Sequence, residues 1–129
     1  MSEKIKLVQG DTRPQLRYVV TDETTGQIVD ISGATTKLRF RAAGTTVVLF
    51  TLTGYLQSGI EDEDGNVTQA GPGQAYETPG KGGRVAFQFG AGNLDVPPGA
   101  YEGELEVTFG DTSVQTVYSP TKFVVRAQF

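Results

Sequence analysis

The fold of this chain is decided by one stretch, Val96-Pro97-Pro98-Gly99-Ala100-Tyr101-Glu102-Gly103-Glu104-Leu105-Glu106-Val107-Thr108-Phe109. Its two prolines and following glycine predict a turn, because proline fixes φ and glycine accepts φ > 0. Apolar and acidic residues then alternate, with Tyr101, Leu105, Val107 and Phe109 on one face and Glu102, Glu104, Glu106 and Thr108 on the other. This alternation is typical of an antiparallel strand that buries its apolar face and exposes its acidic face.

Other short segments of the same kind follow along the chain, separated by glycine, proline and other turn residues. We expect strands at about residues 4–8, 14–21, 34–41, 45–53, 84–89, 113–118 and 123–129, besides the 100–109 strand. The run Thr45–Thr53 is nearly continuous in apolar and β-branched residues, which favours a strand covered on both sides. About seven to eight strands without a helical period predict an all-β fold, an Ig-like antiparallel β-sandwich. The same spacing also suits a small barrel or a jelly roll.

The entry into the 100–109 strand carries a further sign of a sandwich. In Ig-like sandwiches a tyrosine near the start of one strand donates a hydrogen bond back to the backbone a few residues upstream. Tyr101 follows Pro98-Gly99 at such a strand entry. The pattern therefore resembles this tyrosine corner.

The acidic row on the 100–109 strand can be interpreted as a cation site or as a solvated outer face. Same-face neighbours on a strand stand ~7 Å apart, too far for three carboxylates to clasp one ion. The 34–41 strand carries a basic row, Lys37, Arg39 and Arg41. If the two strands pair antiparallel in one sheet, the rows meet, and each exposed pair contributes at most about 1 kcal/mol. We therefore expect these pairs to fix the strand register.

The stretch Gly54–Gly83 differs from the rest, with eight glycines, two prolines and the acidic cluster Glu61-Asp62-Glu63-Asp64. We expect a flexible, exposed insertion in a single domain of residues 1–129, with a small hairpin turning at Asp64-Gly65. A calcium loop starting at Asp62 does not fit. An EF-hand needs glycine at its sixth position and glutamate at its twelfth, where this chain has Val67 and Gly73.

Candidate partner contacts fall in the same stretch. Aromatic rings among flexible glycines suit an adaptable contact surface. A core or loop-anchoring role is the alternative for the tyrosines. The candidates are two tyrosines and three acidic residues: Tyr55, Tyr76, Glu61, Asp62 and Asp64.

Composition excludes several classes of function. The chain has no histidine and no cysteine, which removes the commonest general base, the commonest metal ligand and any disulfide. Its net charge of −4 argues against nucleic-acid binding. No apolar run is long enough to span a membrane, and we expect no signal peptide from the start Met-Ser-Glu-Lys. We expect a non-enzymatic protein without a cofactor or a metal.

Several segments together resemble the N-terminal Ig-like domain of siphophage baseplate upper proteins and related phage structural proteins. The opening Ile5–Pro14 is similar to the start of that domain. The D-L-T-G-A step of the family into its next strand is similar to Val29-Asp30-Ile31-Ser32-Gly33-Ala34-Thr35. Gly83–Phe87 and Pro98–Phe109 are similar to its closing half. The likeness covers most of the chain, and Gly54–Gly83 is where it departs.

The resemblance implies a virion structural or adaptor protein, used in tail, baseplate, neck or fibre attachment. Its implied partners are other virion proteins, with a homo-oligomer also open, and its implied place is the virion after assembly in the host bacterial cytoplasm. In that family a longer fibre or receptor-binding region usually follows this domain, whereas we expect a stand-alone module here. The alternative is a carbohydrate-binding β-sandwich module, for which Tyr55 and Tyr76 are the candidate aromatics.

Overall fold

The computed structural model describes residues 4–22, 24–62, 64, 66–117 and 120–128. This part of the chain contains strands and turns and no helix. Its strands are β1 (Ile5–Val8), β2 (Leu16–Val19), β3 (Thr35–Ala42), β4 (Phe50–Thr53), β5 (Tyr55–Leu56), β6 (Ile60–Glu61), β7 (Val67–Thr68), β8 (Arg84–Phe87), β9 (Gly99–Thr108), β10 (Val114–Thr116) and β11 (Thr121–Arg126).

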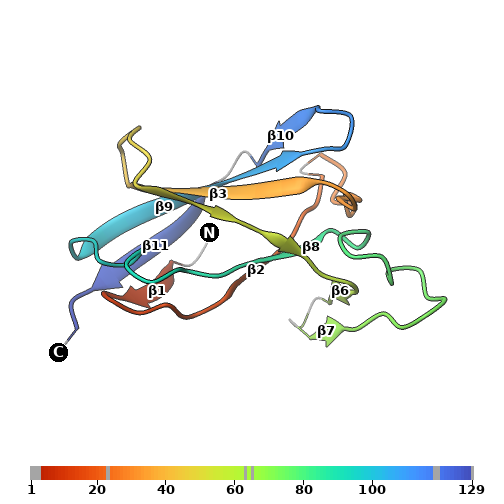
Figure 1. The fold of residues 1–129 in the computed structure, drawn as a ribbon, viewed down its shortest axis with the longest axis horizontal. Coiled ribbons are helices and arrows are strands. Elements are labelled where there is room, and N and C mark those ends of the chain that lie inside the picture. The colour runs from red at the N-terminus through yellow and green to blue at the C-terminus, as the bar shows by residue number, and fades with distance from the viewer. Residues whose placement is uncertain (1–3, 23, 63, 65, 118–119, 129) are drawn as a thin grey trace.

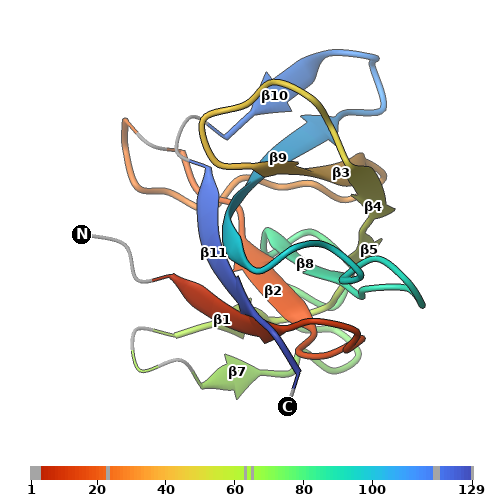
Figure 2. The same cartoon turned by 90° about the vertical axis from the view of Figure 1, so that its left-hand side faces the viewer.

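Two sheets pack face to face. The large sheet has the order β1-β11-β9-β3-β4, with β10 beside the far end of β9, and the small sheet has the order β2-β8-β5. Figure 1 shows the arrangement, and Figure 2 shows the large sheet curving around from β1 to β4 with β2 and β8 across from it. The all-β sandwich that the sequence predicts is confirmed.

One pair departs from the antiparallel expectation. Strand β1 runs parallel to β11, from Ile5 beside Phe123 to Val8 beside Arg126, so the first and the last of the described strands lie side by side at one sheet edge. The order β1-β11-β9-β3-β4 over β2-β8-β5 corresponds to the two-sheet division of Ig-like domains. The Ig-like assignment stays a prediction that this order supports.

Strand β9 lies between β11 and β3 in the large sheet and buries one of its faces, as its alternation predicts. Tyr101, Gly103, Leu105 and Val107 are buried, while the glutamates between them are half exposed. Strand β3 pairs with β9 over eight positions and buries Leu38 and Phe40. The Phe40 ring is surrounded by aromatic rings, at centroid distances of 4.6 Å from Phe50, 5.1 Å from Phe123 and 5.2 Å from Tyr101. Such rings bury large areas and dominate a core.

The small sheet supplies the other half of this core. The inward faces of β2 and β8 carry Leu16, Val85 and Phe87, all of them buried. Tyr18 is half-buried between the sheets, where its hydroxyl donates to Thr121 Oγ1 at 2.9 Å. Burial raises the pKa of the Tyr18 phenol. Because this hydrogen bond joins β2 to β11, it ties one sheet to the other.

Two expectations about the large sheet are confirmed. The register sets Lys37 opposite Glu106, Arg39 opposite Glu104 and Arg41 opposite Glu102, so the basic and acidic rows lie side by side. The Tyr101 hydroxyl donates to the Pro97 carbonyl, four residues upstream, as in a tyrosine corner. The turn at the prolines is therefore fixed to the strand that follows it.

The expected strand Thr45–Thr53 is wrong in extent and in burial. Only Phe50–Thr53 form a strand, and β4 buries Leu52 on one face while Thr51 and Thr53 on the other face are exposed. Before it, Val47, Val48 and Leu49 are 68%, 44% and 47% exposed. An aliphatic run does not specify whether a second layer covers its outer face, and here that face is exposed.

The expected insertion 54–83 also needs correction, because its two ends belong to the sandwich. Tyr55 and Leu56 form β5, which pairs with β8, and Arg84 Nη1 donates to the Ser58 carbonyl at 3.0 Å. At the other end, the Gly80 carbonyl accepts from Ile31 N–H at 2.9 Å. Between these ends, β6 and β7 form the expected small hairpin, of which Glu63 and Gly65 lie outside the described residues. Tyr118, expected in the 113–118 strand, lies outside them as well.

Candidate functional site

Two glutamates of the acidic row on β9 form ion pairs with arginines of β3. Glu106 accepts from Arg39 at two points, with Arg39 Nη1 at 2.7 Å and Nη2 at 3.2 Å, and Glu102 lies 3.5 Å from Arg41 Nη2. The hydrogen bond from Arg39 holds the pKa of Glu106 below its ordinary value, and the same bond raises the pKa of Arg39. The row therefore works as a cross-strand ladder. Within the described ranges, no group of three or more acidic side chains is placed to hold a metal ion.

The edge segment, Thr45–Thr53, is the first surface that stands out. Its nine residues include no charged residue, no proline and no glycine. Natural edge strands usually carry lysine, proline, a bulge or an inward charge, because an unpaired edge is a template for another strand. Three consecutive aliphatic side chains, Val47, Val48 and Leu49, are exposed here.

The backbone of the edge segment is open on one side. Its bonds to β3 include Leu49 N–H to the Phe40 carbonyl at 2.8 Å and Gly54 N–H to the Thr36 carbonyl at 2.9 Å. Bonded and non-bonded pairs alternate along an antiparallel ladder, so Thr51 and Thr53 turn their N–H and C=O groups away from β3. No described strand lies on that side of β4.

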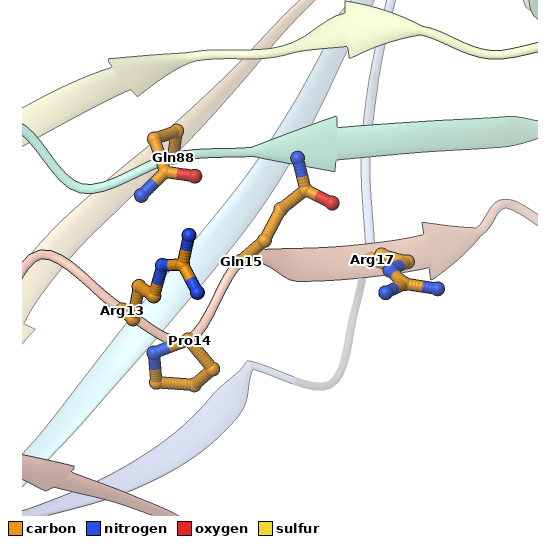
Figure 3. Close-up of a pocket in the computed structure, with 5 residues that line it drawn as sticks. All are labelled: Arg13, Pro14, Gln15, Arg17 and Gln88. Carbon is orange, nitrogen blue, oxygen red and sulfur yellow. The ribbon is translucent and has the colours of Figure 1, made fainter.

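A second surface is the arginine pocket, a cavity of about 510 Å³ lined by Arg13, Pro14, Gln15, Arg17 and Gln88. It lies where the chain enters β2 and leaves β8. In Figure 3 the Arg13 guanidinium lies between the side chains of Gln88 and Gln15, and Arg17 stands further along β2. The Gln15 amide donates to the Tyr55 hydroxyl at 2.7 Å, and the Gln88 amide donates to the Thr12 carbonyl. These bonds hold both glutamines at the rim.

The two guanidinium groups of this pocket have no hydrogen-bond or ion-pair partner among the described residues. The other four arginines are engaged: Arg39 and Arg41 with glutamates, Arg84 with the Ser58 carbonyl and Arg126 with the Ala127 carbonyl. A guanidinium carries five donors in a planar fork that fits a carboxylate or a phosphate. The pocket can therefore accept an anionic group.

Tyr55 borders this pocket. The register places Arg17 opposite Ala86 and Ala86 opposite Tyr55, so the three share the outer face of the small sheet. Tyr55 is 45% exposed. Of the predicted contact residues, it is the one that the structure brings to the arginine pocket.

Tyr76 has different surroundings. Its side chain is half-buried, and it lines a small cavity of about 160 Å³ with Ile60 and Thr68 of the β6–β7 hairpin. Its carbonyl accepts from Gly59 N–H at 2.9 Å. No ring contact joins it to Tyr55 among the described residues. The two tyrosines therefore do not form one stacking platform.

The acidic hairpin, β6 and β7 with the turn between them, carries the three remaining candidates. The Asp62 carboxylate accepts from the backbone N–H of Asp64 at 3.0 Å and of Asn66 at 2.8 Å, so it holds the turn. The carboxylates of Glu61 and Asp64 have no such partner within the described chain. Two of the three candidates are thus available to another molecule.

The arginine pocket was missed from the sequence, although part of its signal is present. Arg13, Gln15 and Arg17 are spaced two apart, which puts them on one face of an extended segment. Gln88 and Tyr55 join them only through the pairing of β8 with β2 and β5, which local spacing does not specify.

Comparisons with known proteins identify no relative. No protein family, curated protein or solved structure matches this chain. The described residues contain no helix long and apolar enough to cross a membrane.

Proposed function

We propose that this chain is a non-enzymatic structural or adaptor protein of a phage virion, acting through protein–protein contacts in tail, baseplate, neck or fibre attachment. The resemblance of Ile5–Pro14 and Pro98–Phe109 to phage Ig-like domains supports the phage assignment. The observation that carries the proposal of an assembly role is the uncharged edge segment with its three exposed aliphatic side chains. The protein is made in the host cytoplasm and takes its place in the particle there.

The edge segment suits a strand from a neighbouring virion protein. An added strand would satisfy the outward N–H and C=O groups of Thr51 and Thr53, and pockets for alternate side chains would set specificity. Fully burying one aliphatic side chain contributes about 1.5–3 kcal/mol, and Val47, Val48 and Leu49 all retain much of that area in water. A partner strand therefore gains both backbone bonds and apolar contact.

The test is mass spectrometry of density-purified particles from the source, with this chain quantified against the major capsid protein. We expect a fixed ratio that survives washing for the wild-type chain. Val48→Lys should lower that ratio about tenfold, because a lysine at the contact loses apolar burial and adds a charge to desolvate. Absence of the wild-type chain from clean particles would reject the proposal.

Val114→Lys is the matched control. Val114 is 57% exposed on β10, which is not a neighbour of β4 in the strand order. Val114→Lys therefore makes the same substitution at an exposed valine outside the edge segment. It should leave the particle ratio unchanged. Equal ratios for Val48→Lys and the wild type would reject the edge segment as the contact.

A carbohydrate-binding module is the second candidate, and the exposed Tyr55 ring beside polar amides is the observation that favours it. An exposed ring of this kind can stack on a sugar. Binding on a glycan array that disappears with Tyr55→Ala or Tyr76→Ala would support this function over the structural one.

A further inference from the structure

We propose that the arginine pocket binds the acidic hairpin of a second copy of this chain, so that copies join head to tail. The contact rests on the proposed assembly role, but it uses the small sheet, whereas the edge segment belongs to the large sheet. Its ligand class is the protein carboxylate, presented by Glu61 and Asp64.

The pocket side of this contact is two arginines, Arg13 and Arg17, that have no hydrogen-bond or ion-pair partner within the described ranges. Arg13 and Arg17 line a cavity of about 510 Å³, and none of the described residues that line it is acidic. In a chain with 15 acidic residues, 11 basic residues and four other arginines already engaged, two unpaired guanidinium groups at one cavity are the exception. A charge-assisted hydrogen bond to a carboxylate is about twice as strong as a neutral one. The pocket has the donors for more than one carboxylate.

The hairpin side is two carboxylates, those of Glu61 and Asp64, that have no hydrogen-bond or ion-pair partner among the described residues. The Asp62 carboxylate is engaged, because it accepts from the backbone N–H groups of Asp64 and Asn66. Asp64 is exposed and Glu61 is half exposed. The two hydrogen bonds to Asp62 restrain the backbone at Asp64 and Asn66, which lowers the conformational freedom that these residues lose on binding.

The two sides lie at opposite ends of β8, which makes a contact within one copy unsuitable. Gln57 N–H donates to the Arg84 carbonyl at 2.9 Å, so the chain leaves for the hairpin at the Arg84 end of β8. Gln88 follows Phe87 and lines the pocket at the other end. Figure 1 places β6 and β7 at one end of the molecule's long axis.

Head-to-tail joining has a structural consequence. When each copy passes its hairpin to the next copy, the contact is heterologous, and its repetition gives a closed ring if the rotation closes and a filament if it does not. Each copy offers one pocket and one hairpin, so the assembly continues through every copy. A pair of copies related by a twofold axis would instead fill both pockets reciprocally and stop at a dimer, so the size of the assembly distinguishes the two arrangements.

The experiment uses sedimentation velocity on the full chain at fixed ionic strength, about 0.1 M, where the screening length is about 10 Å. All proteins carry Val48→Lys, so that the edge segment does not contribute. The pocket variant is Arg13→Gln with Arg17→Gln, and the hairpin variant is Glu61→Gln with Asp64→Asn. Asp62 is retained because it holds the turn, and circular dichroism confirms that each variant is folded.

We expect the parent chain to form species larger than a dimer as its concentration rises. Each variant alone should associate at least about tenfold more weakly than the parent. An equimolar mixture of the two variants should form a complex that stops at two chains. One intact pocket then meets one intact hairpin, and no free pair remains. Substitutions that only weaken association in general would not give such a two-chain complex from a mixture of the two variants.

Four results would overturn the proposal. They are a parent chain that does not grow beyond a dimer, variants that associate like the parent, a mixture that forms no two-chain complex, and association lost in the pocket variant alone. A monomeric parent that binds a sulfated oligosaccharide through Arg13 and Arg17 would assign the pocket to an anionic glycan instead. None of these results bears on whether the edge segment mediates incorporation into the particle. The proposed function and the head-to-tail contact can therefore fail independently.

Discussion

Replacing Gly54 with alanine tests whether the two sheets are as tightly joined as the structure indicates. Gly54 lies between β4 and β5, where the chain crosses from the large sheet to the small one. A Cβ atom there would lie 2.3 Å from Thr36 Oγ1, 2.8 Å from Val85 Cγ2 and 2.9 Å from the Phe87 ring. All three distances are shorter than real Cβ contacts allow.

The expected cost follows from which atoms would have to move. Thr36 belongs to the large sheet, Val85 and Phe87 belong to the small sheet, and each of the three is at most 1% exposed. No single flexible side chain can give way, so the sheets themselves must shift. Overpacking of this kind costs about 1–3 kcal/mol, and we place Gly54→Ala at the upper end. The total stability of a domain is about 5–15 kcal/mol, so the variant should still fold.

The assay is guanidinium unfolding followed by far-ultraviolet circular dichroism, because the chain has no tryptophan. Gly110→Ala is the matched control, since a Cβ at Gly110 meets nothing within 4 Å and its φ is not in the left-handed region. A glycine of that kind gains about 0.4–1 kcal/mol on replacement with alanine, because the unfolded chain loses freedom. If Gly54→Ala and Gly110→Ala have unfolding free energies within about 0.5 kcal/mol of each other, the tight crossing is refuted.

Two further predictions concern β9. Tyr101→Phe removes the hydroxyl that donates to Pro97 and keeps the ring beside Phe40, so it should lower the unfolding free energy by about 0.5–1.5 kcal/mol. Tyr55→Phe, which loses an exposed hydroxyl, should stay within about 0.5 kcal/mol of the wild type, and equal losses in both would contradict a special role for the corner. A double-mutant cycle of Arg39→Gln and Glu106→Gln should give a coupling of about 0.2–1 kcal/mol at pH 7. Because the pKa of Glu106 is lowered, this coupling is present above the ordinary glutamate pKa and is lost as pH falls through the lowered value. Coupling that persists in acid would contradict the ion pair as its source.

The sequence predicts those parts of the fold that depend on the alternation of apolar and polar residues along a single strand. The 100–109 strand and its basic partner can be found because period-two patterns specify a face, and opposite charges then specify a register. The tyrosine corner can be found because Tyr101 and Pro97 are four residues apart. Each of these predictions needs only neighbours along one strand or one pair of strands.

Glycine composition misleads where glycine serves packing. The stretch 54–83 is predicted to be an exposed excursion, yet Gly59, Gly82 and Gly83 are buried. A Cβ at Gly59 would lie 2.0 Å from the Thr68 carbonyl oxygen, and one at Gly82 would lie 2.3 Å from the Gly59 carbonyl oxygen. These glycines allow backbones to approach closely. Composition alone does not separate this use from flexibility, because both need the same missing side chain.

The two proposed surfaces differ in what would control them. The edge segment is uncharged and gains from apolar burial, so its contact with a partner strand depends little on salt. The arginine pocket and the acidic hairpin attract by charge, and raising the ionic strength shortens the screening length and weakens that attraction. The chain has no histidine, the side chain whose charge ordinarily changes between pH 5 and 8. An assembly built from both surfaces would therefore loosen at the charged contact first when salt rises, while its edge contact holds.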